Sequence, residues 1–186
     1  MTSQHTWEGH AESHLPTGFD PLDGYPTDAD HTTLAGRVTT LEAASVATVV
    51  RKTANQTNTG VTITDDTELL FAVAANEVWT YEIWLIVNSP TGSDFQHDFT
   101  IPASATIYRN YVGKEVAGAI VERRNTVAGT DEEIETSGAA ELLAPIRGIV
   151  VNGANAGTVT LRWSQDVDAG EAAVLANSFL IKRKLA

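Results

Sequence analysis

The stretch Glu77–Asn88, EVWTYEIWLIVN, is the longest apolar run of the chain and holds two of its four tryptophans. Successive side chains of a β-strand point to opposite faces, so the odd-numbered positions from Trp79 to Val87 form a wholly apolar row. The even-numbered row, from Val78 to Ile86, is mixed. β-Branched and aromatic residues crowd the stretch, and neither helical spacing nor a cap residue organises it. It predicts the central strand of an all-β domain, with the odd-numbered row in the core.

The even-numbered row is unusually apolar for the outer face of a sandwich. Trp84 and Ile86 stand beside Glu82, where a two-layer fold normally presents polar side chains to water. An apolar outer face of this kind marks an interface, or it is covered by a loop of the same chain. We expect this row to pack toward neighbouring subunits, and burial under a loop is the alternative.

Length and composition limit the possible functions. A chain of 186 residues can bury one good core and carry an appendage. It has 12 Lys and Arg against 24 Asp and Glu, a formal net charge of −12, and no basic block that could follow a phosphate backbone, so we expect no nucleic-acid partner. Cysteine is absent, which excludes a disulfide framework and Cys-ligated zinc. No apolar run reaches membrane-spanning length and the N-terminus does not look like a secretory signal, so we expect no membrane partner.

Residues 1–30 do not look like a folded unit. Three of the six prolines fall here, among glycines and aspartates that prevent a strand or a helix from propagating. Apolar residues are nevertheless spaced through the segment, and a purely solubilising tail would carry few of them. We interpret it as an extended docking arm that becomes ordered on a partner surface, the alternative being a mobile tail. The expected partner-binding residues are Trp7, Leu15, Phe19, Leu22 and Tyr25.

A short helix is predicted over residues 31–45, with Asp30 as its N-cap. Leu34, Val38 and Leu41 follow at spacings of four and three, the a/d pattern of a coiled coil. Threonine and glycine make the segment a poor helix former, so association with other copies would help it. A trimeric coiled coil between subunits is one interpretation, and a helix packed on its own domain is the other.

Residues 46–186 have a β pattern throughout and predict one β-sandwich domain. Many short apolar segments separated by turn sequences, with no helical pattern between them, favour a jelly-roll-like antiparallel sandwich. The expected strands are Val46–Thr53, Gly60–Thr64, Glu68–Val73, Glu77–Asn88, Asp94–Ile101, Ala105–Val112, Val116–Arg124, Glu133–Thr136, Leu142–Val151, Thr158–Gln165 and Ser178–Lys184.

No residue pattern points to catalysis, to a cofactor or to a firm metal site. There is no nucleophile elbow and no recognisable triad context. The pair His10 and His14 lacks the context of a metal motif. His97 alternates with two phenylalanines and is expected to be a packed residue. The carboxylate clusters, Asp65-Asp66-Glu68, Asp131-Glu132-Glu133-Glu135 and Asp166-Asp168-Glu171, lie at predicted turns where solvated acids are ordinary, and calcium binding by the last of them is left open.

Three segments together resemble a β-domain of tailed-bacteriophage virion proteins. They are VVRKTANQTNTGVTITDDTELLFAVAANEVWTYEIWLIVNS, DFTIPASAT and GTVTLRWSQDVDAGEAAVLANSFLIKRKLA. The sequence features that carry the resemblance are the opening R-K-T, the segment D-x-E-L-x-F-x-V-x-A-N that leads into the aromatic strand, and the strand L-R-W-S-Q before S-F-L-I-K-R. The resemblance covers about the last three-quarters of the chain. It implies a trimeric jelly-roll module of a head fibre, capsid decoration or tail fibre, and it carries no catalytic residues.

The resemblance and the arm lead to one main functional hypothesis. It is a non-enzymatic virion structural protein, a homotrimeric capsid decoration or head fibre that assembles in the host cytoplasm and docks on the outer surface of the virion. Its expected partner is the phage major capsid protein or another virion protein. The alternatives are a tail or neck fibre subunit and a host-glycan-binding adhesin, for which Tyr108 and Tyr111 are the aromatic candidates. The expected oligomer interface comprises Leu34, Val38, Leu41, Trp84 and Ile86.

Overall fold

The computed structural model describes residues 28–114, 120–126, 128–129 and 131–186. The chain divides into two compact units, residues 1–43 and 44–186. The helix α1 spans Asp28–Ser45, and strands make up the second unit.

Helix α1 begins earlier than expected. Asp28 and Asp30 both lie in its first turn, so Asp30 is not the N-cap, although both carboxylates suit the positive end of the helix dipole. Thr32, Thr33 and Thr39 donate hydroxyl hydrogen bonds to the carbonyl four residues earlier, which satisfies these groups within the helix. Every side chain from position 28 to position 39 is exposed.

The second unit is an antiparallel β-sandwich in which every strand pair described is antiparallel. A six-stranded sheet has the order β1-β14-β4-β11-β7-β8, and two four-stranded sheets have the orders β3-β12-β6-β9 and β10-β5-β13-β2. The strands are β1 Thr48–Arg51, β2 Gln56–Asn58, β3 Thr64–Val73, β4 Val78–Trp84, β5 Ile86–Asn88, β6 Phe95–Thr100, β7 Thr106–Lys114, β8 Ile120–Asn125, β9 Glu132–Ile134, β10 Glu141–Leu142, β11 Ile146–Val151, β12 Gly157–Gln165, β13 Ala172–Val174 and β14 Phe179–Lys184.

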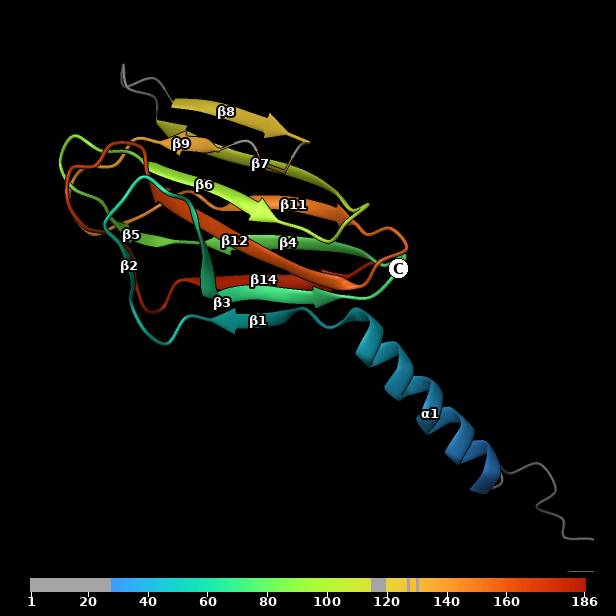
Figure 1. The fold of residues 1–186 in the computed structure, drawn as a ribbon. Helices are drawn as coiled ribbons and strands as arrows, with labels where there is room; N and C mark the ends of the chain where they lie inside the picture. Colours follow the sequence, from blue (N-terminus) through green and yellow to red (C-terminus); the bar gives the residue numbers. More distant parts are fainter. Residues whose placement is uncertain (1–27, 115–119, 127, 130) are drawn as a thin grey trace, which may run out of the picture. The chain divides into compact units, whose positions relative to one another are not determined.

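The core lies between the six-stranded sheet and the sheet formed by β3, β12, β6 and β9, which cross in front of it in Figure 1. The odd-numbered row of the central stretch faces this core as predicted: Tyr81, Ile83, Leu85 and Val87 are buried, and Trp79 is half-buried against them. Aromatic rings from both sheets meet there, with the centroids of Tyr81 and Phe99 5.3 Å apart. The jelly-roll-like sandwich expected from the sequence is confirmed.

The central stretch is not one continuous strand. It breaks at Leu85, and β5 leaves the six-stranded sheet to pair with β10 and β13. At the break, the Ile86 amide donates to the Ser178 hydroxyl at 2.9 Å instead of to a strand. Ile86 therefore lies in a different sheet from Trp84, which a period-two pattern could not reveal.

Other strand boundaries also differ from the prediction. The expected strand Gly60–Thr64 is largely a loop, because the Asn58 side chain binds the Gly60 amide and the Thr62 carbonyl and closes a turn. The expected strand Leu142–Val151 is split into β10 and β11 around Pro145. The strand Ala172–Val174 was missed because alanine carries a weak β signal.

Among the described residues, two ion pairs are fully buried in the sandwich. Lys52 Nζ lies 2.9 Å from Asp66 Oδ1 and Arg109 Nη1 lies 2.9 Å from Asp98 Oδ1, with none of the four side chains exposed. Asp66 also accepts hydrogen bonds from the Leu69 amide and the Trp163 indole. The Asp65-Asp66-Glu68 cluster is thus not the solvated turn that we expected: β3 already begins at Thr64, and its alternation turns Asp66 inward.

His97 is packed in the core, as its alternation with phenylalanines predicted. Its ring lies edge-on to Tyr111 with centroids 4.7 Å apart. Burial lowers the pKa of His97 from 6.5 to about 3, and the positive charge of Arg109 adds to the effect. The imidazole is therefore neutral in the folded protein at neutral pH.

The buried His97 makes stability depend on pH. Between pH 6.5 and pH 3 the unfolded chain binds a proton at His97 that the folded chain does not, so stability falls as the pH falls. Compared with His97→Gln, the wild type should lose about 2 kcal/mol more unfolding free energy between pH 7 and pH 5. Urea titrations at the two pH values measure this difference. His31→Gln, an exposed position on α1, is the control, and equal losses in wild type and His97→Gln would contradict the prediction.

Candidate functional site

The candidate site is the outer face of the six-stranded sheet, meaning the side that points away from the core. Because Tyr81 and Ile83 of β4 point inward, Thr80, Glu82 and Trp84 point outward. The strand register places side chains from all six strands in one outward row. In order from β1 to β8 this row contains Val49, Ile181, Glu82, Arg147, Asn110 and Arg124.

Large apolar side chains are exposed across this outer face. Tyr108 is 48% exposed and Ile149 is 40% exposed, and the register pairs them on neighbouring strands. The exposed set on the outer face is Val49, Tyr108, Val112, Ile120, Ile149 and Val151. Leu70 is the corresponding exposed residue on β3, where the facing sheet carries mainly polar side chains outward. Apolar exposure is thus concentrated on one side of the sandwich.

Trp84 is held in place on the outer face by two contacts. Its ring stacks on Phe179 with centroids 6.2 Å apart, and its indole N–H donates to Glu82 Oε1 at 2.5 Å. Glu82 Oε2 in turn accepts from Arg147 Nε at 2.7 Å. Trp84 is therefore half-buried by its own strand neighbours, and its polar atom is satisfied.

Four charged groups of the outer face form two pairs, Glu82 with Arg147 and Glu122 with Arg124. Arg124 lies 3.0 Å from Glu122 on the same strand, and Asn110 also donates to Glu122. The hydrogen bond from Arg124 is the main cause that lowers the pKa of Glu122, and the hydrogen bond from Asn110 lowers it further. These side chains are largely exposed, so the pairs arrange the surface more than they stabilise the fold.

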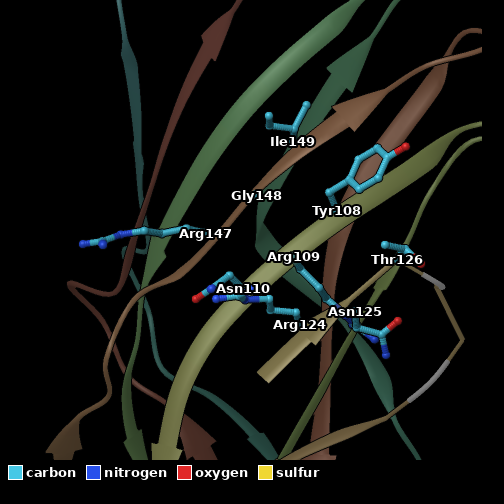
Figure 2. Close-up of a pocket in the computed structure, with 9 residues that line it drawn as sticks. All are labelled: Tyr108, Arg109, Asn110, Arg124, Asn125, Thr126, Arg147, Gly148 and Ile149. Carbon is cyan, nitrogen blue, oxygen red and sulfur yellow. The ribbon is translucent and has the colours of Figure 1, made fainter. Parts of the chain in front are cut away.

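A depression of about 710 Å³ lies over β7, β8 and β11. Figure 2 shows Tyr108 and Ile149 together at one end of it and Arg147 at the other. At Gly148 a Cβ would lie 2.5 Å from the Tyr81 hydroxyl, so glycine is required where that ring passes beneath β11. A smaller depression of about 280 Å³, lined by Thr80, Glu82, Arg147, Ile181 and Arg183 among others, lies on the same face. The depression at Tyr108 has the mixed apolar and polar lining of a binding surface.

The structure places the residues predicted for function in different environments. Leu34 and Val38 are exposed on α1, at 57% and 42%. Trp84 lies on the outer face, while Ile86 belongs to another sheet. Tyr111, an aromatic candidate for glycan contact, is buried at 1% exposure, whereas Tyr108 is exposed. The side chain of Leu41 and the arm residues Trp7, Leu15, Phe19, Leu22 and Tyr25 lie outside the described part of the chain.

Sequence reasoning missed Arg147 and Ile149. The sequence signal for these two residues was the alternation within Ile146–Val151. Ile146 and Val150 are buried there, whereas Arg147 and Ile149 are exposed. That alternation was hidden inside the longer predicted strand Leu142–Val151. The partner positions on β7 depend on a register that only the folded sheet defines.

The described residues hold neither a candidate metal site nor a candidate membrane-spanning helix. No group of three or more His, Cys, Asp or Glu side chains in the described ranges could hold a metal ion, and Asp166 instead accepts hydrogen bonds from Ser93 and the Asp94 amide. Within those same ranges, no helix has the length and apolar character needed to cross a bilayer.

Comparison with known proteins gives similarities of fold only. No protein-family model and no curated protein matches the chain. Among solved structures, it is similar to the CBM22-1 and GH10 modules of endo-1,4-β-D-xylanase 10B from Clostridium thermocellum, complexed with xylohexaose, with TM-score 0.32 and 12% identity over 72% of this chain and 27% of that chain.

Viral particle proteins give further similarities. One is the infectious bursal disease virus Gx strain structure, with TM-score 0.21 and 12% identity over 75% of this chain and 40% of that chain. The VP2 subviral particle of the same virus has TM-score 0.19 and 11% identity over 75% and 40%. The chain thus spans less than half the length of each of these chains. The sandwich and its exposed outer face are those of a structural or binding β-domain.

Proposed function

We propose that this chain is a non-enzymatic virion structural protein of tailed-phage type, a homotrimeric capsid decoration or head fibre docked by its N-terminal arm. The observation that carries the proposal is the exposure of α1. Every side chain from position 28 to position 39 is exposed, including Leu34 and Val38. An isolated helix of this length and composition is marginal in water, so it gains stability from a partner.

The position of the helix along the chain supports an assembly of like copies. It precedes a β-domain, and Leu34 and Val38 have the spacing of core positions in a coiled coil. Thr32 and Gly36 occupy the opposite side of the same helix, which leaves one narrow apolar stripe. A strand-rich domain that follows a short bundle of three helices fits a projecting virion module.

The proposed trimer predicts a defined mass in solution. Light scattering on the purified chain at micromolar concentration should give three times the chain mass. The paired substitution Leu34→Asp and Val38→Asp should shift the protein toward monomer, because three aspartates at each level of a helix bundle repel one another.

The paired substitution Thr32→Asp and Gly36→Asp is the matched control, since it adds the same two charges on the opposite side of the helix, and a side chain at position 36 meets nothing within 4 Å. It should leave the trimer intact. A wild-type protein that remains strictly monomeric under these conditions would contradict the proposed assembly.

The docking arm predicts a separable particle-binding function. Deletion of residues 1–27 should abolish binding to phage particles and leave a soluble oligomer, because the whole of α1 and the β-domain remain. Co-sedimentation with particles measures the binding, and tailless capsids distinguish a head position from a tail or neck position. Undiminished binding of the truncated protein would refute the arm model.

Glycan binding is a second candidate function, favoured by the exposed Tyr108 ring beside the 710 Å³ depression. An aromatic face with Asn110 and Arg147 nearby can stack on a sugar ring and bind its hydroxyl groups. A glycan array should then show binding that Tyr108→Ala removes and Val167→Ala, in an exposed loop, retains. An array without any binding would exclude this candidate.

A further inference from the structure

The outer face of the six-stranded sheet differs in charge from the rest of the chain. Its described outward side chains include four arginines and two glutamates, a formal balance of +2, whereas the whole chain carries −12. The rest of the chain therefore carries −14. The charged residues of this face are Arg51, Glu82, Glu122, Arg124, Arg147 and Arg183.

The same face has the size of an interface. Six strands spaced about 4.8 Å apart span about 24 Å, and six residues along a strand span about 20 Å, so the face covers about 500 Å². A stable protein interface buries about 800 Å² on each partner. The sheet face alone can therefore supply most of one partner's share, with exposed apolar side chains on β1, β7, β8 and β11 and the Glu82–Arg147 pair on its two central strands.

We infer that the outer face of the six-stranded sheet packs against the acidic surface of a second copy of this chain. Charge complementarity selects this occupant: a face of +2 on a chain whose remainder carries −14 is attracted to a different surface of its own copies. Contact between two different surfaces is a heterologous interface. It generates a closed ring when the rotation from one copy to the next brings the last copy back to the first.

The inferred contact explains the composition of the face. Tyr108, Ile149 and Val151 supply apolar area that stays exposed in the single chain. The pair Glu82–Arg147 lies between this apolar area and Trp84, with the Arg147 side chain 59% exposed and able to reach a carboxylate of the next copy. The inference rests on the proposed trimer and adds which surface of the β-domain the trimer buries.

Cysteine labelling tests the contact cleanly, because the chain contains no cysteine of its own. Ile149→Cys places a thiol on the outer face, and Val61→Cys places one in the uncharged loop between β2 and β3. The two side chains are 40% and 50% exposed in the single chain, so their labelling rates should be similar if the outer face is free. In the purified assembled protein, the thiol of Ile149→Cys should react with a maleimide at least about tenfold more slowly than the thiol of Val61→Cys.

The controls separate the possible outcomes. Both variants should label at equal rates in urea, and light scattering should give both the wild-type mass. A trimer in which both thiols react equally would overturn the inference and leave the proposed function standing, whereas a monomer would overturn both. Protection that disappears on deletion of residues 1–27, while the trimer persists, would assign the face to the arm and likewise overturn the inference.

Discussion

The buried Lys52–Asp66 pair is the constraint on which the rest of the sandwich depends. Lys52 follows β1 in the six-stranded sheet, and Asp66 belongs to β3 in the facing sheet, with their charged groups 2.9 Å apart and shielded from water. An unpaired buried charge costs several kcal/mol, so neither sheet edge can form its native packing without the other. The indole of Trp163 on β12 binds the same carboxylate and adds the next strand to the arrangement.

The division of β4 into two unlike faces follows from that packing. Once the two sheets face each other, Tyr81 and Ile83 fill the space between them, and the even-numbered side chains must face outward. Trp84 is accommodated there by Phe179 and Glu82, whereas Tyr108 and Ile149 stay exposed. The outer face is therefore a consequence of a well-formed core, and its apolar area is available for binding.

We propose one cause for the exposed features of both units, which is assembly with other copies. Helix α1 exposes Leu34 and Val38, and the β unit exposes the apolar part of its outer face. A helix of marginal stability and a sheet face with opposite charge to the rest of the chain each gain from a partner. The strongly acidic remainder keeps such a protein soluble while it carries these surfaces.

The all-β class, the burial of the odd-numbered row from Tyr81 to Val87 and a helix before the sandwich follow from the pattern of residues along the chain, because alternation and helical spacing are local properties. The burial of Asp66, the departure of β5 from the sheet at Leu85 and the pairing of Tyr108 with Ile149 are visible only in the folded domain. Those features depend on which strands pair and in which register. Such pairing joins residues far apart in the chain and is set by packing of the whole sandwich, which no local pattern contains.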